Sequence, residues 1–294
     1  VSPRAGLAVA VAAVSTSAIL IRWSGAPSIV AAFYRVLLTT AILSPFVLSA
    51  GTRSLTDLSG RQALAAGATG VALAVHFAAW FESLSWTSVA AAVTLVQAQP
   101  IFVAIGAWLL LDERVTRRTV LGIVVAMAGI VTMSLGDFLG GVAVGEAPLL
   151  GNALALVGAV MAALYVLAGR SLRQQLALLP YVTVVYGVAA VSLLAIVVTS
   201  GAPLGGYPPR EWILFVAMAV GPGILGHTLI NWTLEHLESS LVSVALLGEP
   251  VGGTILAVVI LAEIPTPWTI VGGCIVLASI VFTARSNEGD GTGG

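Results

Sequence analysis

A small number of polar side chains interrupt the long apolar runs of this 294-residue sequence, and their chemistry requires an explanation. Glu249 and Gln99 each precede a proline, Pro250 and Pro100 respectively. A charged side chain in an apolar helix costs about 3 kcal/mol unless it is neutral, paired or hydrated. Glu249 is therefore a candidate partner for a ligand ammonium group or a proton site. The alternative is a protonated or hydrogen-bonded residue that holds a helix broken by its proline.

Two pairs of residues carry groups that could bind an amphipathic molecule. His76 and Trp80 are four residues apart, as are His227 and Asn231, so the members of each pair share a helix face. Further candidates for the same wall are Tyr34, Tyr165, Tyr186 and Gln97. Rings would contact an apolar side chain and polar groups its charged ends. Alternatively, the aromatic residues belong to helix packing or to interfacial belts.

Prolines and glycines mark places where helices are expected to break. Pro100 and Pro250 each remove a backbone donor, so the freed carbonyls would line a cavity or the helices would simply kink. Gly221, Pro222 and Gly223 predict a hinge. The same segment matches G-x-G-x-x-G, but a dinucleotide site needs a preceding strand in a soluble βαβ unit, which nothing here predicts.

Arg35 is the arginine placed well inside an apolar run. It would snorkel, pair with a carboxylate, or hold the carboxylate of a ligand. A metal site and a cofactor are not expected, because Cys274 is the only cysteine and the three histidines form no zinc-binding motif. No nucleophile–base motif of a hydrolase is visible either.

The composition of the chain predicts that these residues lie within a membrane. The chain is 59% hydrophobic and 9% charged, with a mean hydropathy of +1.06, whereas a soluble domain is about 25% charged. These values exclude a soluble enzyme, and the net charge of −1 offers no basic field for nucleic acid. The predicted class is an all-α polytopic membrane protein in contact with the lipid bilayer. Its ten spans are expected at about 5–21, 28–50, 62–83, 88–111, 118–136, 148–169, 179–199, 211–231, 239–261 and 268–284.

The arginines predict the orientation. If the N-terminus is inside and the spans alternate, only Arg22 and Arg210 fall outside. The inside segments hold Arg4, Arg53, Arg61, Arg114, Arg117, Arg118, Arg170, Arg173 and Arg285. Cytoplasmic segments carry such an excess of basic residues. We expect a bacterial-type inner (plasma) membrane protein with both termini cytoplasmic.

An internal repeat relates the two halves of the chain. At an offset of 150 residues, QPIFVAIGAWLLLDERVT (99–116) aligns with EPVGGTILAVVILAEIPT (249–266). The predicted units are residues 1–138 and 139–286, followed by a disordered tail at 287–294. Because each unit has five spans, the units run in opposite directions through the membrane, and transporters built this way bind substrate between the halves. On this reading, Glu113 and its counterpart Glu263 are fold markers at opposite membrane faces.

The order of these motifs resembles a known family. The segments that carry the resemblance are FYRVLLTTAIL, HFAAWFESLSWTSVA, LLLDERVT, GIVVAMAGI and LLGEPVGGTILAVVILAEIPT. They are similar to the EamA branch of the drug/metabolite transporter superfamily, and most similar to YddG-type exporters of aromatic amino acids. The resemblance implies ten helices around a central cavity and export of amino acids or similar small metabolites by alternating access.

The resemblance also bears on single residues and leaves alternatives open. The family carries Glu-Pro at 249–250 and an arginine at position 35, which favours shared structural roles, such as an arginine that bonds carbonyls at a helix end. Alternative functions are a multidrug or nucleoside/sugar-conjugate carrier, an intramembrane enzyme, or a structural protein. The sequence does not indicate the oligomeric state.

Overall fold

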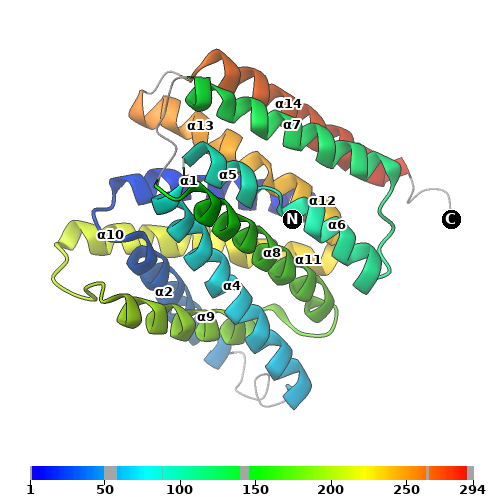
Figure 1. Ribbon diagram of the computed structural model, residues 1–294. Coiled ribbons are helices and arrows are strands. Elements are labelled where there is room, and N and C mark those ends of the chain that lie inside the picture. Colours follow the sequence, from blue (N-terminus) through cyan, green and yellow to red (C-terminus); the bar gives the residue numbers. More distant parts are fainter. Residues whose placement is uncertain (1, 50–57, 88, 140–145, 263–264, 290–294) are drawn as a thin grey trace.

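The computed structural model describes residues 2–49, 58–87, 89–139, 146–262 and 265–289. In these ranges every regular element is a helix, and the helices form one bundle (Figure 1). The helices are α1 (Pro3–Trp23), α2 (Ser28–Ser49), α4 (Gly60–Trp86), α5 (Val89–Val96), α6 (Gln99–Leu110), α7 (Arg117–Leu139), α8 (Pro148–Arg173), α9 (Leu178–Ser200), α10 (Pro209–Met218), the π-helix η1 (Ala219–Thr228), α11 (Leu229–His236), α12 (Ser239–Leu246), α13 (Gly248–Leu261) and α14 (Pro267–Gly289).

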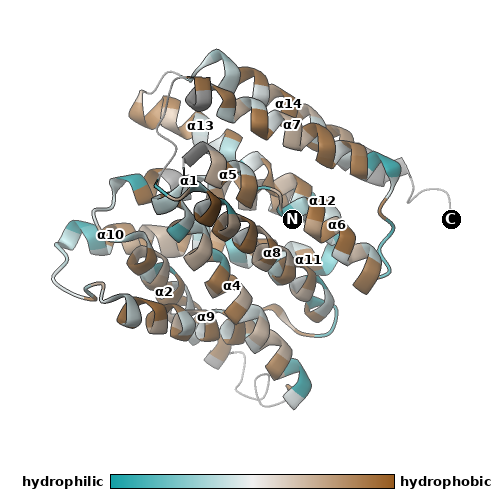
Figure 2. Cartoon of the chain, in the orientation of Figure 1, coloured by the Kyte–Doolittle hydropathy of each residue, from teal (hydrophilic) through white to brown (hydrophobic). Residues whose placement is uncertain are grey.

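The spans agree with the prediction of an all-α membrane protein. Nine stretches of the described chain are long and apolar enough to cross a bilayer, and a shorter apolar helix covers Pro267–Thr283. A bilayer supplies no hydrogen-bond partners to the backbone, so spans of this kind must be helical. The outer surface is correspondingly apolar: Figure 2 shows hydrophobic residues along the helices and hydrophilic ones mostly near their ends. Leu149 and Val259, for example, are 88% and 75% exposed.

Three spans are interrupted, and prolines lie at or beside each interruption. The fourth span changes from α5 to α6 at Gln97 and Ala98, and Pro100 lies in the first turn of α6. The ninth span changes from α12 to α13 at Leu247, three residues before Pro250. Proline is tolerated in a first helical turn because its missing N–H would have no intrahelical acceptor there.

The eighth span contains the third interruption. Gly221, Pro222 and Gly223 lie in η1, where the chain forms a π-helix between two α-helical segments. Pro222 has no N–H to donate, and glycines impose little steric restriction on a widened turn. Widened segments of this kind are frequent at functional sites. The hinge predicted from sequence falls in this segment.

Packing between the helices is reciprocal, as expected for two related halves that run in opposite directions. The first helix of the first half, α1, packs on η1 and α13 of the second half. Its counterpart α8 packs on α4, α5 and α6 of the first half. Further principal contacts join α9 to both α2 and α4, and α7 to α14, and α7 and α14 lie side by side in Figure 1.

The turns before α7 and α14 repeat the same local structure. The Thr116 and Thr119 hydroxyls are 3.0 Å apart, and the Thr119 N–H donates to Thr116 Oγ1 at 3.1 Å. At the positions 150 residues later, the Thr266 and Thr269 hydroxyls are 2.9 Å apart, with the corresponding backbone bond at 3.2 Å. These matching caps extend the internal repeat from sequence to local structure.

Candidate functional site: a cavity between the halves

A cavity of about 550 Å³ lies between the two halves, and both halves contribute to its wall. Small-molecule sites typically enclose about 300–1,000 Å³. Polar side chains are distributed around it and include Ser15, Ser17, Ser28, Arg35, His76, Gln97, Gln99, Ser134, Tyr165, His227, Glu249, Thr254 and Thr269. The cavity is therefore a mixed polar and apolar chamber inside an apolar bundle.

The structure brings nine of the candidate residues named from sequence to this wall. They are Arg35, His76, Trp80, Gln97, Gln99, Tyr165, His227, Glu249 and Pro250. The others lie outside the lining, namely Tyr34, Pro100, Tyr186, Gly221, Pro222, Gly223 and Asn231. Other lining residues were absent from the predicted set although their types suit a ligand wall, and they include Ser17, Phe77, Phe81 and Thr254.

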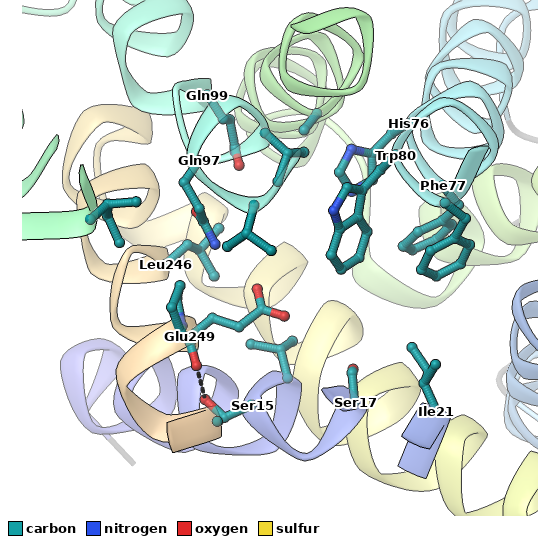
Figure 3. Close-up of a pocket in the computed structure, with 18 of the residues that line it drawn as sticks. Ser15, Ser17, Ile21, His76, Phe77, Trp80, Gln97, Gln99, Leu246 and Glu249 are labelled. Carbon is teal, nitrogen blue, oxygen red and sulfur yellow. Dashed lines mark hydrogen bonds between the residues drawn. The ribbon is translucent and has the colours of Figure 1, made fainter. Parts of the chain in front are cut away.

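Glu249 lies in the first turn of α13, directly after the interruption of the ninth span. Its backbone carbonyl accepts a hydrogen bond from Ser15 Oγ at 3.2 Å (Figure 3). Its carboxylate extends into the cavity, and none of the hydrogen bonds found among the described residues involves it (Figure 3). The helix dipole favours a negative charge in a first turn. The carboxylate is thus placed to receive a partner from the cavity.

Aromatic rings from α4 form a continuous wall of the cavity. The Trp80 and Phe81 ring centroids are 5.0 Å apart, and those of Phe77 and Phe81 are 6.2 Å apart, with small interplanar angles. His76 stacks on Trp80 at 6.1 Å. The spacing of Phe77 and Phe81, four residues apart like His76 and Trp80, was the signal in the sequence that could have identified both phenylalanines.

His76 has a defined tautomer in this wall. Its Nδ1 lies 2.9 Å from the carbonyl oxygen of Gly158 on α8. A carbonyl only accepts, so Nδ1 carries the hydrogen, and the Nε2 of a neutral ring remains an acceptor. His227 Nδ1 and Trp80 Nε1 are buried and have no hydrogen-bond partner in the described chain. No serine–histidine pair of an intramembrane hydrolase therefore forms among the described cavity residues.

Arg35 contributes a cation to the same cavity. Its guanidinium carbon lies 4.4 Å from the centroid of the Phe77 ring, within the range of a cation–π contact. No carbonyl at a helix end bonds it within the described residues, in contrast to the role that the family resemblance suggested. Arg35 and Glu249 both line the cavity, and no ion pair of 4.0 Å or less joins these two described side chains.

Asn231 connects the cavity wall to the interior of the second half. It is fully buried, and its Nδ2 lies 2.6 Å from the Tyr165 hydroxyl and 3.1 Å from the Tyr186 hydroxyl. The Tyr186 hydroxyl is also 3.3 Å from Thr228 Oγ1 at the end of η1. Asn231 and Tyr186 thus lie behind the wall and position Tyr165, which is the member of the group that faces the cavity.

Tyr34 lies apart from the cavity lining. Its ring stacks on Phe215 with a centroid distance of 4.8 Å and meets Trp212 edge-on at 4.9 Å. Its hydroxyl donates to the carbonyl of Leu204. Tyr34 therefore has the packing role that was the alternative interpretation of the aromatic residues.

In the part of the chain that the structure describes, the cavity lining extends toward one end of the bundle. Its lining includes residues near the ends of α1 and α4 and the starts of α2 and α14, represented by Ile21, Leu84, Ser28 and Thr269. These helix ends lie on the membrane face opposite the start of α1, because successive spans alternate in direction. No lining residue comes from the last turns of α6, α8 or α11 within the described chain.

At the face where α1 begins, a polar network joins the two halves. Glu113, in the turn between α6 and α7, forms an ion pair with Arg170 of α8 at 2.8 Å. Its carboxylate also accepts hydrogen bonds from the Ser239 N–H at 3.1 Å and the Ser239 hydroxyl at 2.7 Å. Arg170 donates to the carbonyl of Leu234 at 2.9 Å. This network links both halves and closes the bundle at that face.

The titratable groups do not suggest a metal centre. No group of three or more histidine, cysteine, aspartate or glutamate side chains that could hold an ion occurs in the part of the chain that the structure describes. The groups that the cavity wall presents are a carboxylate, a guanidinium, amides, hydroxyls and rings. Glu263, predicted as the counterpart of Glu113, lies outside the described residues.

Comparison with known proteins assigns the fold to a family. The model of the EamA-like transporter family matches twice, at residues 5–135 and 149–285. The chain belongs to the EamA-like transporter family. The family predicted from sequence is confirmed at this level. The match to each half accords with the repeat that the helix packing shows.

Two individual proteins are similar to this EamA family member. An uncharacterized transporter of Archaeoglobus fulgidus is 29% identical over 191 residues, which cover 65% of this chain and 66% of that protein. A protein of known crystal structure shares 21% identity and superimposes with a TM-score of 0.82, covering 97% of this chain and 96% of the other. At 21% identity, the similarity to this second protein shows a shared fold.

Proposed function

We propose that this EamA family member is a secondary transporter that exports amino acids with aromatic or apolar side chains across the inner membrane. The observation that carries the proposal is the cavity wall, in which the unbonded carboxylate of Glu249 shares one chamber with the rings of Phe77, Trp80 and Phe81. A carboxylate binds the ammonium group of the substrate, and stacked rings accept its apolar side chain.

The transport cycle follows from the arrangement of the halves. Residues 1–138 and 139–286 are the proposed repeat units, and the cavity lies between them. Related halves that run in opposite directions can exchange conformations and so open the same site to either face. The present arrangement, closed at the face where α1 begins, is one of the two states of such an alternating-access cycle. Positive-inside orientation makes that face cytoplasmic.

Efflux from proteoliposomes tests the transport function. Vesicles that contain the purified protein and labelled phenylalanine should release it faster than protein-free vesicles. Glu249→Gln keeps the size of the side chain but removes its charge, so we expect efflux to fall at least tenfold. Glu146→Gln is the matched control, because Glu146 is exposed and does not line the cavity, and its efflux should equal that of the wild type.

The outcomes separate the parts of this proposal. Absence of protein-dependent efflux of every amino acid tried would contradict the amino-acid assignment. Unchanged efflux in Glu249→Gln would show that this carboxylate does not bind the substrate. The same variant also tests proton coupling. If Glu249 carries a coupled proton, Glu249→Gln should lose gradient-driven transport while exchange persists, and an unchanged pH dependence of transport in this variant would exclude that role.

A second candidate substrate class is the organic cations, which include many drugs. The same carboxylate beside an aromatic wall favours an amine or quaternary ammonium group, whether or not the molecule carries an acid. Distinguishing this class from amino acids requires a group in the cavity that recognises the other end of an amino acid.

A further inference from the structure

We propose that Arg35 and the Phe77 ring beneath it form the subsite for the substrate carboxylate. The transported class would then be zwitterions with a free acid group, and amines that lack one would be excluded. This inference rests on the proposed transport function and deepens it, because it assigns the second charged end of the substrate. It also decides between amino acids and organic cations.

No hydrogen bond or ion pair of 4.0 Å or less among the described residues accounts for the position of the Arg35 guanidinium, although the charge of Glu249 attracts it across the cavity. The residue is 6% exposed and lies within the second span, where it lines the cavity. Among the described residues its guanidinium forms no hydrogen bond and no ion pair of 4.0 Å or less, and its carbon lies 4.4 Å from the centroid of the Phe77 ring. A buried charge is ordinarily paired and hydrogen-bonded, because desolvating it is costly. A group of this kind requires an anion or ordered water from the cavity.

The chemistry of the guanidinium selects the anion. Its five N–H donors lie in one plane and match the two oxygens of a carboxylate in a bidentate arrangement. The Phe77 ring covers one face of the guanidinium and restricts its orientation. The donors that remain along the edge of the plane are then available to a ligand. An ordered edge loses less conformational entropy on binding than a free arginine would.

The groups around Arg35 leave room for the anion of a ligand. Rings from three elements line the same cavity as Arg35: Phe77 and His76 on α4, His227 on η1, and Tyr165 on α8. Tyr186 on α9 shares the small void behind it.

Glu249 on α13 is the one carboxylate in the described cavity lining, and no ion pair joins it to Arg35. Opposite charges held apart on one wall fit a molecule that carries both, with its carboxylate at Arg35 and its ammonium at Glu249.

Binding of two matched probes tests this subsite. L-Phenylalanine and phenethylamine share the ring and the amino group, and only the first has a carboxylate. Binding to the purified full-length protein is measured by calorimetry for both. We expect the wild type to bind phenylalanine at least tenfold more tightly, because the amine leaves Arg35 desolvated without an anion.

Substitution of Arg35 should remove the preference for phenylalanine over phenethylamine. In Arg35→Met, affinity for phenylalanine should fall at least tenfold, whereas affinity for phenethylamine should stay within threefold of the wild type or rise. Arg35→Lys keeps the charge but lacks the planar set of N–H donors, so its affinity for phenylalanine should lie between those of the wild type and Arg35→Met. This variant preserves the test if the methionine variant does not fold. Arg118→Met, at an exposed site outside the cavity, is the control and should bind both probes normally.

Three outcomes would overturn the subsite. The first is equal affinity of the wild type for the two probes. The second is a folded Arg35→Met variant that loses the same factor of affinity for phenylalanine and for phenethylamine. The third is recovery of phenylalanine binding in Arg35→Met/Glu249→Gln, which would show that the two charges merely neutralise each other. In the first two cases, binding of the probes that depends on Glu249 would leave the proposed transport function standing. The third outcome would also count against Glu249 as the site of the substrate ammonium, and wild-type protein that binds neither probe would contradict both proposals.

Discussion

At the scale of single residues, the cavity wall depends on groups that lie behind it. Asn231 has no exposed surface, yet its amide reaches the hydroxyls of Tyr165 and Tyr186, which come from different helices. A buried hydroxyl that loses its partner costs about 1–3 kcal/mol. Asn231 therefore determines the position of Tyr165 in the wall without touching a ligand.

A double-mutant cycle tests this role of Asn231. Asn231→Leu should lower the free energy of unfolding by about 2–3 kcal/mol, because both tyrosine hydroxyls lose a donor. Tyr165→Phe removes one of those hydroxyls, so the double variant should be more stable than the sum of the single effects by about 1 kcal/mol. Thermal or denaturant unfolding in detergent measures the three values. Strict additivity would show that the contact contributes nothing.

At the scale of elements, η1 is placed by its close approach to α2. A Cβ atom added to Gly223 would lie 2.2 Å from the Thr39 hydroxyl oxygen, much closer than any van der Waals contact. That hydroxyl is itself bonded to the carbonyls of Arg35 and Ala219, so it does not move away easily. The contact fixes the π-helix against the helix that carries Arg35.

Alanine at Gly223 should therefore be destabilising, and removal of the obstructing hydroxyl should compensate. We expect Gly223→Ala to lower the free energy of unfolding by about 1–3 kcal/mol through overpacking. Thr39→Ala added to it should recover part of that loss. Gly187→Ala on α9 is the matched control, since its Cβ would meet nothing within 4 Å and the variant should be at least as stable as the wild type. A neutral Gly223→Ala would contradict the packing argument.

At the scale of the whole molecule, the two halves enclose the cavity toward one end of the bundle, and a polar network links them at the other end. Glu113 belongs to the first half, and its partners Arg170 and Ser239 belong to the second. Charge-assisted hydrogen bonds of this geometry are among the stronger ones in proteins. In the proposed cycle, this network must break before the cavity can open at the face where α1 begins.

Hydrogen exchange should report the opening of this network. In Glu113→Gln, the first amides of α12 should exchange about tenfold faster than in the wild type, because the Ser239 N–H loses its charged acceptor. Amides of α9, which takes no part in the network, should be unchanged. Uniformly faster exchange in both helices would instead indicate general destabilisation, and no change at α12 would show that Glu113 does not hold this face closed.

The sequence by itself determined the class of the molecule, the spans and the places where they break. A bilayer admits uninterrupted backbone structure only as helix or closed barrel, so long apolar runs fix the secondary structure, and Pro100 and Pro250 mark its interruptions. The repeat at an offset of 150 residues likewise follows from residue identities, and it already implied two halves of opposite direction.

Only the tertiary structure decided which side chains share the cavity. Spans that are apolar on all sides give little periodicity, so the sequence does not reveal which face points inward. Tyr34 and Phe77 were therefore not separable by pattern, yet one packs near α10 and the other lies beneath the guanidinium of Arg35. The rotation of each helix is set by packing between halves, and that packing alone leaves Arg35 and Glu249 unpaired on a common wall.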